Sequence, residues 1–128
     1  MFENTNYEKV LEFTRAFNLP LSNPPKIPKG DLHKLRVNLI FEELAEFLEA
    51  AARDDLPKAT KELCDVLYVV YGYAASMGID IDFAFQQVHE ANMSKLDDLG
   101  KPVFRDDGKV TKGKAYKPVD ESRLVLAL

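Results

Sequence analysis

Residues 42–77 read EELAEFLEAAARDDLPKATKELCDVLYVVYGYAASM, and this stretch decides the fold class that the sequence predicts. Apolar residues recur at helical spacing on both sides of a break at residues 54–57, where two aspartates and a proline interrupt the pattern. The period before the break extends back to about residue 32, which predicts a helix over residues 32–53. Pro57 suits the first turn of a second helix, which should run to about residue 76.

Two more helices should flank this pair. Apolar residues at helical spacing predict a first helix over residues 7–17, and a weaker period predicts a fourth over residues 83–96. From Gly100 onward, prolines and glycines interrupt every period, so the tail should form turns and loops with one short helix near Leu124. The predicted fold is an all-α bundle of four helices with an irregular, basic C-terminal tail.

The two central helices should bury different amounts of surface. Helix 32–53 carries one apolar stripe and begins after a cap offered by Gly30-Asp31. Helix 57–76 is apolar nearly all round, so it should be buried on almost every side, which would make Cys64 inert. The stripe expected in the core consists of Val37, Ile40, Phe41, Leu44, Phe47, Leu48 and Ala51.

The length and composition fit one compact domain. A chain of 128 residues with 46% apolar and 30% charged residues can build one core but not two, so residues 1–128 should form a single domain. Cys64 has no partner for a disulfide or a cysteine zinc cluster, which favours a reducing cytoplasm. No basic leader precedes an apolar run, and the longest apolar stretch, residues 66–75, is about half a membrane span. Neither export nor membrane insertion is expected.

The charges are distributed unevenly along the chain. Residues 1–94 carry 9 basic and 15 acidic side chains, whereas residues 95–117 carry 7 basic and 4 acidic ones. The net charge of −4 argues against non-specific nucleic-acid binding, so no nucleic-acid partner is expected. Taken alone, the mildly basic tail is explained by a solvated loop. A metal site formed by carboxylates in residues 1–94 would change that interpretation.

Two pairs of carboxylates mark a candidate metal site. Glu43 and Glu46 are three residues apart on one predicted helix, and Glu62 and Asp65 are three apart on the next. At about 100° per residue, each pair projects from one face of its helix. Four carboxylates that meet in a bundle repel one another unless a cation lies between them, and oxygen ligands suit Mg²⁺ or Mn²⁺. We therefore expect these four residues to bind one of these metals.

A solvated acidic face is the alternative. Glutamate is a good helix former, and for helix 32–53 alone an exposed acidic run is slightly favoured. Glu62 and Asp65 favour the metal, because they open the apolar run of the next helix. A buried ionised carboxylate is costly unless it is paired or coordinates a metal.

These residues resemble a known family, the all-helical NTP pyrophosphohydrolases that include MazG, dimeric dUTPases and phosphoribosyl-ATP pyrophosphohydrolase-like proteins. The family's signature is two adjacent acids, a third acid three residues after the second, and Glu-x-x-Asp on the next helix. It stands here as Glu42-Glu43-x-x-Glu46 and Glu62-x-x-Asp65. The segments LCDVLYVVYG (63–72), VHEANMSK (88–95) and DGKVTKG (107–113) are similar to later motifs of the phosphoribosyl-ATP pyrophosphohydrolase-like branch. The resemblance spans about residues 8–118.

The resemblance implies a MazG-like bundle and an activity. Such an enzyme cleaves a nucleoside triphosphate to the monophosphate and pyrophosphate with Mg²⁺, and dUTP or a non-canonical nucleotide is among the substrates to consider. Glu43, Glu46, Glu62 and Asp65 would be its metal ligands, while Asn92, Lys95, Lys112 and Tyr116 would contact the nucleotide. Lys114 and Val119 depart from the family's pattern in the tail.

The roles expected for Glu42 and Phe17 are inferred from the residues and not from the family resemblance. Glu42 adjoins the ligands but belongs to no i, i+3 pair, so its catalytic role would be to orient or deprotonate the attacking water or to hold a second ion. An exposed acid is the alternative for Glu42. Phe17 could stack on a base, although aromatic residues at helical spacing more often belong to a core.

Other classes of function fit less well. A di-iron carboxylate bundle requires Glu-x-x-His on two helices, whereas Gln86 stands three residues before His89 here. A non-catalytic helical interaction module with a solvated acidic face remains as the alternative, and metal dependence would separate it from the enzyme. Short helices in two layers leave much apolar surface uncovered, so a homodimer or homotetramer should complete the bundle.

Overall fold

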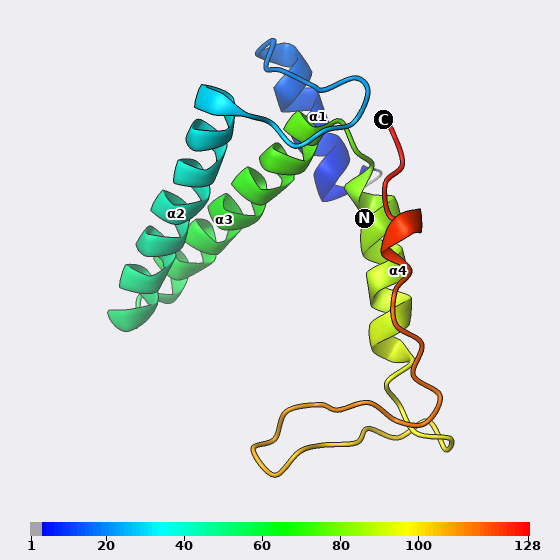
Figure 1. The fold of residues 1–128 in the computed structure, drawn as a ribbon. Helices are drawn as coiled ribbons and strands as arrows, with labels where there is room; N and C mark the ends of the chain where they lie inside the picture. The colour runs from blue at the N-terminus through cyan, green and yellow to red at the C-terminus, as the bar shows by residue number, and fades with distance from the viewer. Residues whose placement is uncertain (1–3) are drawn as a thin grey trace. The chain divides into compact units, whose positions relative to one another are not determined.

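The computed structural model describes residues 4–128, and four α-helices dominate this part of the chain (Figure 1). The helices are α1 (Asn6–Ala16), α2 (Gly30–Ala52), α3 (Leu56–Met77) and α4 (Ile81–Met93), followed by a short 3₁₀ helix, η1 (Glu121–Arg123). Residues 4–128 contain no β-strand beyond two isolated bridges, which confirms the all-α fold class. α4 ends at Met93, three residues before the predicted end at residue 96.

Local sequence signals explain where the helices begin and end. The Asp55 side chain accepts a hydrogen bond from the Lys58 amide at 3.1 Å, and Pro57 lies in the first turn of α3. Gly78 ends α3 in the left-handed conformation, with φ 75°. The cap expected for α2 is wrong, because α2 already begins at Gly30 and the preceding Lys29 makes no side-chain capping bond.

The chain forms two compact units, which are described separately. The first unit contains the described residues up to Ile81 together with Ala127 and Leu128, and the second contains Asp82–Leu126. In the first unit, α2 and α3 lie side by side along their length and α1 packs on the C-terminal half of α3 (Figure 1). Tyr7 of α1 donates a hydrogen bond from its hydroxyl to the Ile79 carbonyl at 2.6 Å. The core of this unit consists of Tyr7, Leu11, Ala74, Ala75 and Ile79.

The predicted burial of the two central helices is wrong for the single chain. Within the described part of the first unit, α1 and α2 are the helices that cover α3, and one of its apolar faces stays open, with Leu63, Leu67 and Val70 45–48% exposed. Cys64 is exposed as well. On α2 the expected core stripe is also largely open, with Phe41 66% and Leu48 56% exposed. The residues of α2 that are buried are Arg36 and Ala50.

The second unit joins α4 to the basic tail. The Gly113 amide donates a hydrogen bond to the Lys95 carbonyl at 2.8 Å, and the Lys117 amide donates one to Ser94 Oγ at 2.9 Å. These bonds fold the tail back onto the segment that follows α4.

In the described part of the chain, no helix is both long and apolar enough to span a membrane.

Candidate functional site

Three carboxylates from two helices converge where α2 packs on α3. Glu43 of α2 and Glu62 and Asp65 of α3 each offer one carboxylate oxygen, and these oxygens lie within 4.8 Å of one another. Glu62 and Asp65 share one face of α3 because they are three residues apart, and Glu43 reaches that face from α2. We call these three residues the carboxylate cluster.

The carboxylate cluster contains two polar atoms that lack a hydrogen-bond partner. Glu43 Oε2 and Glu62 Oε2 are both shielded from solvent and accept no hydrogen bond. The Glu62 side chain is 7% exposed, whereas that of Asp65 is 33% exposed. Leaving a buried acceptor without a donor costs about 1–3 kcal/mol, and more for a charged group. A cation placed between these oxygens would remove this cost.

The pKa values of two acids in the carboxylate cluster are raised by burial and by the negative groups that lie close to them. Burial raises the pKa of Glu43, and the negative charges of Glu46 and Asp65 raise it further. Burial also raises the pKa of Glu62, where a hydrogen bond with the Glu46 side chain adds to the effect. Both carboxyl groups therefore hold a proton more readily than an ordinary glutamate, as expected for acids brought together without a counter-ion.

Lys61 partly balances the carboxylate cluster. Its Nζ lies 2.6 Å from Asp65 Oδ2 and 3.8 Å from Glu62 Oε1. The hydrogen bond and charge of Asp65 raise the pKa of Lys61, so the ammonium form is favoured. The Lys61 side chain is 68% exposed, which leaves it free to move away from Asp65. The i, i+4 spacing of Lys61 and Asp65 is a sequence signal for this pair.

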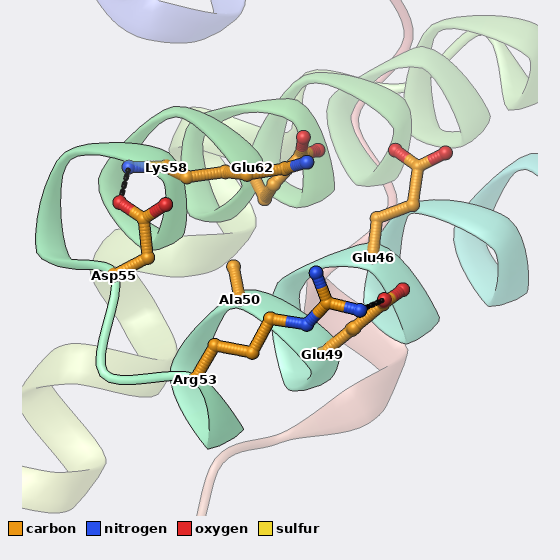
Figure 2. Close-up of a pocket in the computed structure, with 7 residues that line it drawn as sticks. All are labelled: Glu46, Glu49, Ala50, Arg53, Asp55, Lys58 and Glu62. Carbon is orange, nitrogen blue, oxygen red and sulfur yellow. Dashed lines mark hydrogen bonds and ion pairs between the residues drawn. The ribbon is translucent and has the colours of Figure 1, made fainter.

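The two remaining acids of the predicted site, Glu46 and Glu42, are not among the three converging acids. Glu46 is exposed on α2, and together with Glu62 it lines a cleft of about 340 Å³ between the end of α2 and the start of α3. Figure 2 shows Glu46 and Glu62 on facing helices, with Arg53 and Lys58 toward the turn. Glu42 is exposed and lies outside the group of three converging acids.

The predicted nucleotide contacts fall in two places. Phe17 follows α1, is 63% exposed and packs on Phe13 with ring centroids 4.3 Å apart. In the second unit, Lys112 Nζ lies 4.9 Å from the centroid of the Tyr116 ring. The backbone of Lys95 is bonded to Gly113 and, through its amide, to the carbonyl of Asn92 at 3.1 Å. The structure thus brings Asn92, Lys95 and the Lys112–Tyr116 segment together within this unit, and their contact with a nucleotide stays a prediction.

Comparison with known proteins identifies the family. Residues 10–92 match the sequence model of the phosphoribosyl-ATP pyrophosphohydrolase family. The chain belongs to this family. The matched residues include α2, α3 and all the acids of the predicted metal site, whereas Lys95, Lys112 and Tyr116 lie beyond them. The match therefore agrees with the family resemblance of the two acidic motifs.

Two individual proteins are also similar to this chain. Over 118 residues it is 31% identical to an uncharacterized protein, L479, of Acanthamoeba polyphaga mimivirus, and the match covers 84% of this chain and 42% of the viral protein. The chain therefore spans less than half the length of that relative. A crystal structure from Exiguobacterium sp. 255-15, named as a candidate NTP pyrophosphohydrolase, shares 22% identity with a TM-score of 0.48, over 95% of this chain and 93% of the other.

Proposed function

We propose that this member of the phosphoribosyl-ATP pyrophosphohydrolase family is a Mg²⁺-dependent hydrolase that converts an NTP or dNTP to the monophosphate and pyrophosphate. The observation that carries the proposal is the convergence of Glu43, Glu62 and Asp65, whose oxygens lie within 4.8 Å of one another. Family membership supports the same class of reaction. A triphosphate adds its own negative charge to this acidic site, so the reaction needs a cation between substrate and protein.

The donor set of the carboxylate cluster fits a hard divalent cation. All the donors are oxygens, and two of them are buried without any partner. Mg²⁺ binds such oxygens together with waters and substrate phosphates, and Mn²⁺ is the usual substitute. In this proposal Glu43, Glu62 and Asp65 hold the ion, with Glu46 as the fourth ligand from the adjoining cleft. The bound ion supplies positive charge that polarises phosphoryl oxygens and lowers the pKa of a bound water.

The chain's own residues perform the remaining steps. Glu42 lies one residue before Glu43 and is exposed, so its carboxylate can orient the attacking water and accept its proton. The water oxygen forms a bond to the α-phosphorus, and the bond from that phosphorus to the bridging oxygen breaks. Pyrophosphate leaves with the bridging oxygen. The Lys61 side chain is 68% exposed, so it would be free to leave Asp65 at a site that holds an ion.

The nucleotide is held in this proposal by the residues that the family resemblance named. Lys95 and Lys112 hold phosphates as point charges, while Asn92 and Tyr116 contact the sugar or base. Phe17 stacks on the base, which its 63% exposure permits. We include dUTP and non-canonical nucleotides among the proposed substrates.

A substrate screen tests the proposed function. All common NTPs and dNTPs, with dUTP and an oxidised or methylated nucleotide, are incubated with the protein with and without Mg²⁺, and pyrophosphate and orthophosphate are measured separately. The proposal requires Mg²⁺-dependent release of pyrophosphate from at least one of them. Metal-independent release would contradict the proposed Mg²⁺ dependence, and no release from any nucleotide would favour the non-catalytic interaction module.

A second copy of the chain is the proposed partner. The open face of α3 carries Leu63, Leu67 and Val70, each nearly half exposed, and α2 exposes Phe41 and Leu48 beside it. An apolar surface of this kind on a single chain is typical of an interface. We propose that a homodimer or homotetramer covers it and completes the helical bundle.

A further inference from the structure

Arg36 is a buried cation without an ion-pair partner in the part of the chain that the structure describes. It lies on α2 with 8% of its surface exposed. Its Nε is shielded from solvent and donates no hydrogen bond. Among residues 4–128 no carboxylate lies within 4.0 Å of its guanidinium, although ion pairs occur elsewhere. A buried charge without a counter-ion is destabilising, so its presence points to a ligand that supplies the opposite charge.

The opposite helix leaves room for this side chain. Gly72 of α3 faces Arg36, and a Cβ atom at Gly72 would lie 3.2 Å from Arg36 Nη1. A glycine inside a helix costs about 1 kcal/mol relative to alanine. Without a ligand, Gly72 on α3 and the buried Arg36 on α2 thus both lower the stability of the folded protein. The missing side chain of Gly72 leaves space for the Arg36 guanidinium between the helices.

Arg36 lies on the same helix faces as the carboxylate cluster. It precedes Glu43 by seven residues on α2, and Gly72 follows Asp65 by seven residues on α3. Seven residues are nearly two full turns of a helix. The Arg36–Gly72 pair and the carboxylate cluster therefore lie on the same faces of α2 and α3, about 10 Å apart along the helices. A guanidinium and a set of carboxylates therefore follow one another along the line where α2 meets α3.

We propose that Arg36 binds a phosphoryl group of the substrate whose metal ion is held by the carboxylate cluster. This inference rests on the proposed function and adds a further substrate-binding residue to it. The planar guanidinium donates two parallel hydrogen bonds to phosphate oxygens, a geometry that Lys95 and Lys112 cannot provide. Burial lowers the pKa of Arg36 in the absence of substrate, and an incoming phosphate would restore the charge balance. A carboxylate of a second copy is the competing occupant.

Arg36→Met and Arg36→Lys test the inference, with Arg15→Met as the matched control because Arg15 is an exposed arginine of α1. The measurements on each variant are the melting temperature without ligand, the oligomeric state by sedimentation, and the affinities for Mn²⁺ and for inorganic triphosphate in Mg²⁺. The kcat and KM for the best nucleotide are measured as well. Arg36→Met should melt at the same or a higher temperature, because it removes an uncompensated buried charge. Its Mn²⁺ affinity should be unchanged, while its triphosphate affinity should fall at least tenfold and KM should rise.

The outcomes separate this inference from its alternatives. Arg36→Lys should retain part of the triphosphate affinity, since it keeps the charge but loses the paired donors. A lower melting temperature with unchanged triphosphate affinity would assign Arg36 a structural role and overturn the inference. Dissociation of Arg36→Met into smaller species at unchanged affinity would overturn it as well and assign Arg36 to a partner's carboxylate. If the parent released no pyrophosphate yet bound triphosphate through Arg36, the proposed function would fail and the binding role would stand.

Discussion

Glu62 and Asp65 differ in how far their negative charge is already balanced. Glu62 is 7% exposed with one unpartnered oxygen, whereas Asp65 is paired with Lys61 at 2.6 Å. We predict that Glu62→Gln and Asp65→Asn each abolish pyrophosphate release, because each removes a ligand charge while keeping the side chain's shape. The metal-free Glu62→Gln protein should be at least as stable as the parent, since repulsion falls. Asp65→Asn loses an exposed ion pair worth about 0–1 kcal/mol, so its stability should change little.

Pyrophosphate release and thermal melting without metal measure both effects. Glu12→Gln on α1 is the control, because Glu12 is exposed and remote in sequence from the cluster. Full activity in Asp65→Asn would contradict the proposal that Asp65 is a metal ligand.

Lys112 tests the role of the basic tail. Its Nζ already lies over the Tyr116 ring at 4.9 Å, so the side chain is directed by a neighbour that is itself a predicted contact. Losing one ionic phosphate contact typically costs about 1.5–3 kcal/mol, so Lys112→Ala should weaken nucleotide binding roughly ten- to hundredfold. Equilibrium binding of a non-hydrolysable nucleotide measures this loss, and Mn²⁺ affinity should not change. Unchanged binding would favour the interpretation of the tail as a solvated loop. Lys101→Ala serves as the control.

Some of these residues can be predicted from the sequence and others cannot. The i, i+3 spacing places Glu62 and Asp65 on one face whatever the rest of the chain does, so their convergence is predictable. The burial of Arg36 is not, because a lone arginine in a helix is normally exposed. It depends on Gly72, which lies 36 residues later on another helix, and no local pattern joins the two.

Among the helices, α3 has the most clearly specified end. Gly78 has φ 75°, and a Cβ there would lie 1.8 Å from the Ser22 carbonyl oxygen. Gly78→Ala should therefore destabilise the protein by about 2 kcal/mol or more, because backbone strain and a clash act together. Gly30→Ala is the matched control, since Gly30 also has positive φ (62°) but a Cβ there would have nothing within 4 Å. Urea unfolding compares the two, and equal losses would show that the approach to Ser22 is unimportant.

Helix ends are easier to predict than helix faces. Asp55, Pro57 and Gly78 act within one turn, so their effect does not depend on the rest of the fold. Which apolar face packs inside the chain depends on the number of neighbouring helices. The helical period places Phe41 and Leu48 in the core, yet they are exposed because α2 meets α3 through Arg36 and Ala50 instead.

Association of two or more chains would explain this exposed apolar surface. We predict that the protein sediments as a dimer or tetramer and that Leu67→Glu, at a residue 48% exposed on α3, shifts it toward monomer. A buried charge opposes association, whereas the same change at Ile27, which is 60% exposed outside the helices, should have no effect. Analytical ultracentrifugation over a range of concentrations measures both. A monomeric parent would leave the open face of α3 without its proposed partner.

The position of bond cleavage tests the central claim most directly. The best substrate is hydrolysed with Mg²⁺ in ¹⁸O-enriched water, and the products of the parent and of Asp65→Asn are followed by ³¹P NMR and mass spectrometry. Water attack at the α-phosphorus predicts ¹⁸O in the nucleoside monophosphate, unlabelled pyrophosphate, and no products from Asp65→Asn. Labelled pyrophosphate would contradict attack at the α-phosphorus, and release of orthophosphate would contradict a pyrophosphohydrolase. Equal turnover by Asp65→Asn would contradict a reaction that works through the carboxylate cluster.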